Sequence, residues 1–428
     1  MTSPVFRTAG GAEKAPYKSD FVLMKRRTNM KKKLLAFVMA ATMVFSLAAC
    51  GSSSSNDSSN SGSSSDSAQS GDEVQTFKLG SIGPLTGDAA IYGQAVVNGA
   101  KLAVDEINAS DSKIKFEFKG EDDEADGEKS TNAYNQLMDW GMQVLVGPTT
   151  TGASMAVADV CNSERTFMIT PSASAVDVTA GKDNVFQVCF TDPNQGISSA
   201  DYIAENMPDA KIAVLYRNDD AYSQGIHDTF VKEATEKGMS VVYEGTFTEA
   251  SQTDFNVQLA GAQSAGADLL FLPIYYTPAS VILTQANAMG YAPTFFGVDG
   301  MDGILTAENF DASLAEGVYL LTPFSADSED EMTQNFVAEY QDRFGEIPNQ
   351  FGADAYDAIY TLYQAIQAAG ATADMSNEEI CDALIEVMPT LAVTGLTSAG
   401  SEMTWDENGA VSKDPTAVII ENGTYVTP

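Results

Sequence analysis

From residue 76 onward the chain alternates short apolar runs of strand length with longer stretches of helical periodicity. The segment "FKLGSIGPLTG" predicts a strand that ends in a Gly/Pro turn, and after it Val96, Ala100 and Val104 recur at helical spacing. The segment "KIKFEFKG" alternates apolar and polar residues, as a half-exposed strand does. Further strand-like runs are "MQVLVGP", "TFMITPSAS", "KIAVLYRND", "SVVYEG", "ADLLFLPIYY", "PTFFGVDG" and "GVYLLTP". Strands that alternate with helices predict an α/β fold with parallel sheets. Because these strand and helix units are too many for one compact sheet, we expect two α/β lobes.

Two segments are candidates for crossings between the lobes, because in each a strand runs into a turn that contains proline. They are "VCFTDPNQG" near Asp192 and "YLLTPFSAD" near Pro323. Several crossings would interleave the lobes in sequence and link them by a hinge. Near the end, "TWDENGAVSKD" and "VIIENGTYV" each contain an Asn-Gly pair, which predicts hairpin turns.

The charge of the chain excludes one class of partner. The formal net charge is −36, and nine of the 23 Lys and Arg residues precede Cys50. The part after Cys50 therefore carries 14 basic and 57 acidic residues, a net charge of −43. Such a surface repels nucleic acid and anionic lipid head groups, so we expect neither as a partner of the folded part.

The stretch before Cys50 predicts an export signal. Lys31, Lys32 and Lys33 form a positive region, and residues 34–49 are mostly apolar but short for a membrane span. The end of this stretch, "LAAC", resembles the lipobox of bacterial lipoproteins, which implies that Cys50 is acylated and becomes the first residue after cleavage. Simple cleavage with Cys50 incidental stays an alternative. We expect a signal peptide at 1–49, in which the N-terminal part before the positive region is longer than export requires.

A serine-rich segment follows Cys50. Residues 52–70 are nearly all Ser, Asn, Asp and Gly, which cannot bury apolar surface. We therefore expect residues 50–75 to be a disordered linker that tethers the folded body to the outside of the bacterial cell membrane.

Residues suited to catalysis or metal binding are few. His227 is the only histidine, so a nucleophilic site would depend on one residue that we expect on a helix surface. Cys161, Cys189 and Cys381 show no CxxC spacing, which argues against a metal site, and a Cys161–Cys189 disulfide stays open. The segment "DDEADGEK" begins like a calcium loop, but Ala133 stands where the twelfth position requires Glu. We expect no enzyme activity, no metal and no cofactor.

Two hydroxyl-rich turns follow strands and precede helices. They are "VGPTTTGAS" and "TPSASAVDV". In open α/β sheets, ligands bind beyond the carboxyl ends of the strands, where helix N-termini present free N–H groups. Thr151, Ser172 and Ser174 could add hydroxyl donors there to a small anion such as a carboxylate, although helix capping is an alternative role for each.

The order of these motifs resembles one family. "GSIGPLTGDAAIYGQAVVNGAKLAVDEIN", "VGPTTTGAS", "ITPSASAVDVT", "TDPNQG", "KIAVLYRNDDAYSQG", "TDFNVQL", "FFGVDG", "AEGVY" and "YDAIYTL" follow the pattern of the solute-binding proteins of branched-chain amino acid ABC transporters. The resemblance implies a type I periplasmic-binding-protein fold with three hinge crossings and mostly parallel sheets with helices on both faces. It also implies delivery of an amino acid to permease subunits. On this basis lobe 1 would comprise 76–192 and 324–392, and lobe 2 193–323 and 393–428.

The resemblance also implies roles for individual residues. The ligand carboxylate would meet Thr151, Ser172 and Ser174 in lobe 1, and its ammonium group would meet Asp299 in lobe 2. Aromatic side chains would surround the rest of the ligand, namely Tyr92, Tyr222, Tyr275 or Tyr276, and Phe351. A ligand-sensing protein of the same fold, for another small amide or carboxylate and without transport, stays an alternative.

Overall fold

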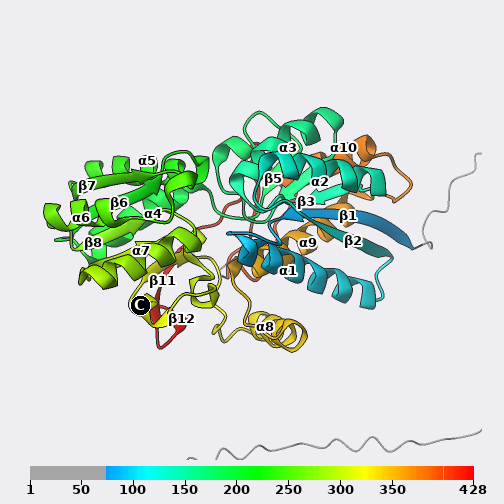
Figure 1. The fold of residues 1–428 in the computed structure, drawn as a ribbon. Coiled ribbons are helices and arrows are strands. Elements are labelled where there is room, and N and C mark those ends of the chain that lie inside the picture. The colour runs from blue at the N-terminus through cyan, green and yellow to red at the C-terminus, as the bar shows by residue number, and fades with distance from the viewer. Residues whose placement is uncertain (1–73, 399) are drawn as a thin grey trace, which may run out of the picture. The chain divides into compact units, whose positions relative to one another are not determined.

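Two separate sheets, each with helices on both faces, organise the part of the chain that the structure describes (Figure 1). The structure is a computed structural model, and it describes residues 74–398 and 400–428, all of which belong to one compact unit. The predicted α/β class with two mostly parallel sheets is confirmed. The expected signal peptide, Cys50 and all but the last two residues of the expected linker lie outside the described residues.

The first lobe is built on a five-stranded sheet in which every pairing is parallel. Its strands, in spatial order, are β2 (Ile114–Asp122), β1 (Gln75–Gly83), β3 (Val144–Val146), β4 (Phe167–Thr170) and β5 (Val185–Gln187). The helices of this lobe are α1 (Ala90–Ala109), α2 (Gly127–Trp140), α3 (Thr151–Glu164), α8 (Glu331–Phe344), α9 (Gln350–Ala369) and α10 (Asn377–Val387), with the short 3-10 turns η1 (Val176–Val178) and η6 (Met388–Thr390).

The second lobe is built on a seven-stranded sheet. Its strands, in spatial order, are β12 (Thr424–Val426), β11 (Thr416–Glu421), β10 (Tyr319–Thr322), β9 (Thr294–Gly297), β8 (Leu269–Leu272), β6 (Lys211–Arg217) and β7 (Ser240–Phe247). Only the pairings of β11 are antiparallel. The helices are α4 (Asp192–Asn206), α5 (Ala221–Glu236), α6 (Asn256–Ala265) and α7 (Tyr276–Met289), with the 3-10 turns η2 (Glu249–Ser251), η3 (Asp299–Met301), η4 (Ile304–Thr306) and η5 (Ala312–Ala315).

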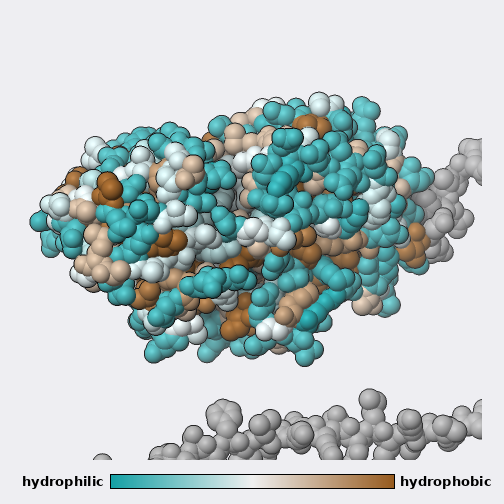
Figure 2. Space-filling view, viewed as in Figure 1, coloured by the Kyte–Doolittle hydropathy of each residue, from teal (hydrophilic) through white to brown (hydrophobic). Residues whose placement is uncertain are grey.

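Strands β3 and β8 are entirely apolar because helices cover both faces of each sheet. On the outside, the face of the molecule in Figure 2 is mostly hydrophilic. Every residue of β3, β4 and β8 is buried, which is the pattern of strands packed on both sides. By contrast, β2 lies at an edge of the sheet, and most of its residues are half-buried. Within residues 74–398 and 400–428, the structure contains no helix with the length and apolar character that a membrane crossing requires.

The chain crosses between the lobes three times. It passes to the second lobe after β5, returns after β10, and passes again before β11. Before the third crossing it lies against the first lobe, since Trp405 Nε1 donates to the Gln187 carbonyl at 2.8 Å and Gln187 N donates to the Gly409 carbonyl at 2.9 Å. These contacts hold residues beyond 393, the start of the second part of lobe 2 that the resemblance implies, against the first lobe.

The last two strands form the hairpin that the Asn-Gly pair predicts. Asn422 and Gly423 connect β11 to β12 with φ of 54° and 74°. Positive φ at both central residues is the geometry of a type I′ turn, in which Asn and Gly are favoured.

Candidate functional site

A small cavity lies between the two lobes. It is lined by Tyr92, Thr149, Thr150, Thr151, Ser172, Tyr222, Tyr275, Asp299, Gly300 and Phe351. Most of these residues come from segments that directly follow the carboxyl ends of parallel strands, as expected for a site in an open α/β sheet. The cavity has room for about one water molecule. A larger ligand therefore fits only after the walls move apart.

The structure brings together seven of the nine predicted ligand residues. Those in the lining are Tyr92, Thr151, Ser172, Tyr222, Tyr275, Asp299 and Phe351. The other two, Ser174 and Tyr276, lie outside it. Ser174 is fully buried, and its carbonyl accepts a hydrogen bond of 3.0 Å from Asp192 N. Burial raises the pKa of Asp192 well above its ordinary value. Tyr276 packs behind Tyr92 with its ring at 90° to the Tyr92 ring.

The first-lobe wall presents hydroxyl groups and the start of a helix. Thr150 is the N-cap of α3, but its side chain makes no capping bond, and within the described part of the chain its buried hydroxyl has no hydrogen-bond partner. The hydroxyl of Ser172 donates to the Thr149 carbonyl at 2.7 Å, which ties the two turns together. The first N–H groups of α3 have no partners within the helix and carry the positive end of its dipole. This wall can bind a carboxylate without Arg or Lys.

The second-lobe wall presents a buried acid. Asp299 begins η3 and is 4% exposed. Its Oδ1 accepts hydrogen bonds from the Tyr222 hydroxyl at 2.5 Å and from Gly300 N at 2.7 Å. Burial raises the pKa of Asp299 to about 7, against the lowering effect of the Tyr222 hydroxyl. A ligand cation beside this carboxyl group would favour its ionised form.

Gly300 follows the acid and has no room for a side chain. A Cβ atom there would lie 2.5 Å from the Tyr222 hydroxyl oxygen, in the hydrogen bond that supports Asp299. Burial, and next the charge of Asp299, raise the pKa of Tyr222 well above its ordinary value, so the hydroxyl stays a donor.

Aromatic rings form the rest of the lining. The Tyr92 ring lies 4.3 Å from Phe351 and 5.3 Å from Tyr275, and Tyr275 lies 5.0 Å from Tyr222 (centroid distances). The Tyr92 hydroxyl, from the first lobe, donates to the Gly300 carbonyl and accepts from Tyr276 N in the second lobe. Apolar ring faces suit an apolar ligand side chain, while these hydrogen bonds hold the two lobes against each other.

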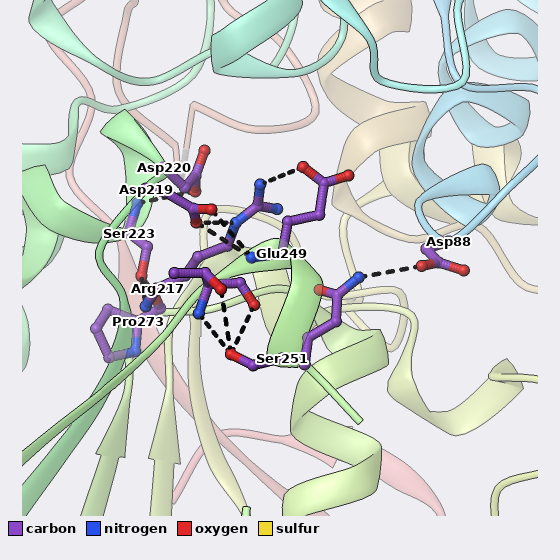
Figure 3. Close-up of polar contacts among 10 residues, drawn as sticks. Asp88, Arg217, Asp219, Asp220, Ser223, Glu249, Ser251 and Pro273 are labelled. Atoms are coloured by element: carbon purple, nitrogen blue, oxygen red, sulfur yellow. Dashed lines mark hydrogen bonds and ion pairs between the residues drawn. The ribbon is translucent and has the colours of Figure 1, made fainter. Parts of the chain in front are cut away.

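Outside the cavity lining, Arg217 lies at the centre of a polar cluster on the second lobe (Figure 3). Its guanidinium group donates to Asp219 Oδ1 at 2.8 Å and to Glu249 Oε2 at 2.9 Å. From the segment beside Glu249, Gln252 Nε2 reaches Asp88 Oδ2 of the first lobe at 3.2 Å (Figure 3). The Thr277 hydroxyl also donates to the Asp88 carbonyl at 2.6 Å. Gln252 and Thr277 therefore add contacts between the lobes outside the cavity.

The sequence-based expectation for His227 was wrong in one respect. It lies on helix α5 but is buried, with its ring stacked on Tyr216 at a centroid distance of 3.6 Å. Its ring nitrogens are 2.8 Å from Asp228 Oδ1 and 2.9 Å from Glu244 Oε2. These partners belong to α5 and β7, away from the cavity, so the ring links the helix to the sheet.

The remaining candidate groups have structural partners. Cys161, Cys189 and Cys381 are buried free thiols, so the disulfide that the sequence left open is not formed. Asp122, from the calcium-like segment, accepts from Leu85 N and from the Thr86 hydroxyl, and Asp126 caps α2. Among the described residues, no group of three or more His, Cys, Asp or Glu is arranged to hold a metal ion.

A family model described as periplasmic binding protein matches residues 76–418, which is most of the chain. This protein belongs to the periplasmic binding protein family. The Leu/Ile/Val-binding protein homolog 3 of Brucella melitensis is 29% identical over 339 residues, which cover 78% of this chain and 88% of that protein. The family resemblance inferred from the sequence is thereby confirmed.

Two solved structures are similar to this chain in both fold and sequence. The branched-chain amino acid substrate-binding protein LivJ from Streptococcus pneumoniae, in complex with isoleucine, is 28% identical with a TM-score of 0.72, and the match covers 83% of this chain and 100% of that one. The leucine-binding protein LivK from Thermotoga maritima is 26% identical with a TM-score of 0.73, and the match covers 82% of this chain and 97% of that one.

Three lining residues were not predicted from the sequence. Thr149 and Thr150 lie in the "GPTTT" turn, but sequence does not fix a helix start to within one residue, so the prediction settled on Thr151. Gly300 contributes backbone, and its only signal was its position after Asp299 in "FGVDG".

Proposed function

We propose that this protein captures an amino acid with an apolar, branched side chain outside the cytoplasm and delivers it to the permease of an ABC transporter. The observation that carries this proposal is the pairing of opposite chemistries on the two walls. Hydroxyls and the start of α3 lie on one wall, and the buried carboxyl group of Asp299 lies on the other.

The two walls match the two charges of an amino acid. The ligand carboxylate would accept from the start of α3, where the Thr150 hydroxyl has no hydrogen-bond partner within the described structure. The ammonium group would lie against Asp299. An ammonium sealed away from water is costly unless it meets an anion, and Asp299 is the only acid in the lining.

The aromatic lining supports an apolar side chain. Tyr92, Tyr275 and Phe351 offer ring faces, and Lys and Arg are absent from the lining residues. The names of the relatives agree with this choice, since they are described as binding Leu, Ile and Val, and the solved LivJ structure contains isoleucine.

Lobe closure follows from the division of the binding site between the two lobes. Neither wall alone satisfies both ligand charges, so the ligand binds the closed form better and shifts the population toward it. The crossings near Asp192 and Pro323, and the one before β11, would bend during this motion. The closed form is then the state that the permease subunits recognise.

We further propose that Cys50 carries a lipid anchor and that the linker up to residue 75 holds the receptor close to the outer face of the cell membrane. Support comes from the "LAAC" motif and the serine tract. In keeping with a binding family, we propose no catalytic reaction for the site.

Isothermal titration with a panel of amino acids tests the proposed function. The protein is first unfolded and refolded to remove any copurified ligand. We expect saturable one-to-one binding of Leu, Ile or Val, and much weaker binding of Asp and Lys, whose side chains would meet an aromatic wall. Binding of simple carboxylates or amides in preference to every amino acid would contradict the proposal and favour a sensor for those compounds.

A further inference from the structure

A second buried acid lies three residues after Asp299 and contacts the opposite lobe. Asp302 ends the η3 turn and is 3% exposed. Its Oδ2 accepts a hydrogen bond of 2.9 Å from the backbone N–H of Gln350, the first residue of α9. Asp302 does not line the cavity.

The side chain of Gln350 makes a second contact with the same turn. Its Nε2 donates to the carbonyl of Asp299 at 3.2 Å, and the residue is 2% exposed. One residue of α9 is thus bonded to both ends of the turn that carries the acid proposed to bind the ligand ammonium.

The two partners belong to different lobes. Helix α9 is fixed in the first lobe along α1, where a Cβ on Gly99 would lie 1.9 Å from the Gly352 carbonyl oxygen. The turn with Asp302 follows β9 of the second lobe, and Tyr425 of β12 supports it through a 3.3 Å hydrogen bond from Gly303 N. Separation of the lobes must therefore break both Gln350 contacts.

The chemistry of the contact favours closure. The first N–H groups of a helix have no partner within the helix, and the positive end of the helix dipole attracts a carboxylate. A hydrogen bond to an ionised carboxylate is stronger than one between neutral groups. Burial raises the pKa of Asp302, and the Gln350 N–H, followed by the Tyr425 hydroxyl, lowers it, so the helix start favours the ionised acid.

We propose that Asp302 and the N-terminus of α9 form a closure latch, which sets the ratio of closed to open protein without touching the ligand. Asp299 and Asp302 share one short turn, so a ligand held by Asp299 positions Asp302 for α9, and a formed latch positions Asp299 for the ligand. Asp302 and Gln350 are positioning residues. The link to the ligand rests on the proposed function, whereas the latch itself does not.

Single substitutions can separate the parts of the latch. Asp302→Asn removes the charge at nearly constant size. Gln350→Pro removes the N–H donor, and proline suits this position because it is the first of the helix and Asn349 before it is extended, with ψ of 177°. Gln350→Ala keeps the N–H and loses only the side-chain contact. Asp311→Asn is the control, since the side chain of this second-lobe acid accepts hydrogen bonds from Ser313 N and the Ser313 hydroxyl in its own turn.

Distances between spin labels on the two lobes provide the readout, measured by pulsed electron resonance on the full chain. The labels are attached at Lys101→Cys on α1 and Glu236→Cys on α5, both exposed, while the three native body thiols are buried. Without ligand we expect a closed population in the parent protein. Asp302→Asn and Gln350→Pro should each lower the closed-to-open ratio about tenfold or more, Gln350→Ala less, and Asp311→Asn not at all.

The double variant Asp302→Asn with Gln350→Pro should open the protein no further than Gln350→Pro alone, because without the Gln350 N–H the charge of Asp302 has no hydrogen bond to strengthen. Distance distributions without ligand that are the same in the parent, Asp302→Asn and Gln350→Pro would overturn the latch. If the parent binds no amino acid, the proposed function fails, while the ligand-free distances still decide on the latch. If Asp302→Asn does not fold, the comparison of Gln350→Pro with Gln350→Ala decides.

Discussion

Replacing Asp299 by Asn removes the acid that we propose to meet the ligand ammonium, while nearly preserving the shape of the side chain. Asp299 is 4% exposed, and its Oδ1 is held by Tyr222 and by Gly300 N. Removing one partner of a buried charge pair costs about 3 to 5 kcal/mol. At about 1.4 kcal/mol per factor of ten, Asp299→Asn should weaken leucine binding by about a hundredfold or more.

The raised pKa of Asp299 changes the expected loss of leucine affinity only slightly. With a pKa of about 7, half of the ligand-free protein carries the proton at pH 7. Releasing it to bind an ammonium group then costs about 0.4 kcal/mol, which is small beside the charge pair.

A des-amino analogue of leucine, 4-methylpentanoate, separates a ligand contact from a structural role. It keeps the carboxylate and the side chain but has no ammonium group, so Asp299→Asn should spare or even improve its binding. Titration calorimetry of both ligands against the parent and the variant measures this contrast. Asp123→Asn is the control, because Asp123 is also buried, with its pKa raised by burial to about 6, but bonds to Ser130 away from the cavity. Equal losses for leucine and its analogue would refute the assignment of Asp299.

Four other predictions concern the pH dependence of binding, the pH dependence of stability, the carboxylate wall and the anchor. Because leucine needs ionised Asp299 and the pKa is about 7, affinity should fall about fifty-fold between pH 7 and pH 5 in titrations, and a flat profile would contradict this. The same group binds its proton more tightly in the folded than in the unfolded chain, so its contribution to ligand-free stability falls as pH rises from about 4 to 7, and Asp299→Asn should raise the melting temperature at pH 8. Thr150→Val should weaken leucine binding about tenfold or more at unchanged melting temperature, whereas Thr361→Val, which removes another buried hydroxyl without a partner in the described structure, should leave binding intact. Cys50→Ala should release the protein from the cells or leave an uncleaved precursor; a variant that fractionates and is processed like the parent would exclude the anchor.

Much of the fold could be predicted because periodicity records which faces are buried. The alternation in "KIKFEFKG" corresponds to edge strand β2, and the Asn422-Gly423 pair to the β11–β12 turn. The strand predicted to run into the turn of "VCFTDPNQG" lies earlier in the chain, as β5, because its three residues pair with β4 and lie close to Gly409, where a Cβ would lie 2.2 Å from the Val185 carbonyl oxygen. Long-range contacts of this kind leave no periodic signal in a short segment.

The site was predictable to the extent that it follows strand ends. Tyr275 and Tyr276 could not be distinguished by sequence, since α7 begins between them and directs only Tyr275 to the cavity. Ser174 has a hydroxyl group in a turn that follows a strand, but it lies outside the lining, fully buried beside Asp192. The contact of Asp302 with Gln350 joins residues 48 positions apart on different lobes, which sequence patterns do not reveal.

A crystal structure of the protein with isoleucine tests the central claim most directly. We predict that the ligand carboxylate accepts hydrogen bonds from the start of α3, including the Thr150 hydroxyl, and that its ammonium group lies within hydrogen-bond distance of Asp299. The side chain should lie against Tyr92 and Phe351. Isoleucine bound with its ammonium group away from Asp299, or bound outside this cavity, would contradict the account.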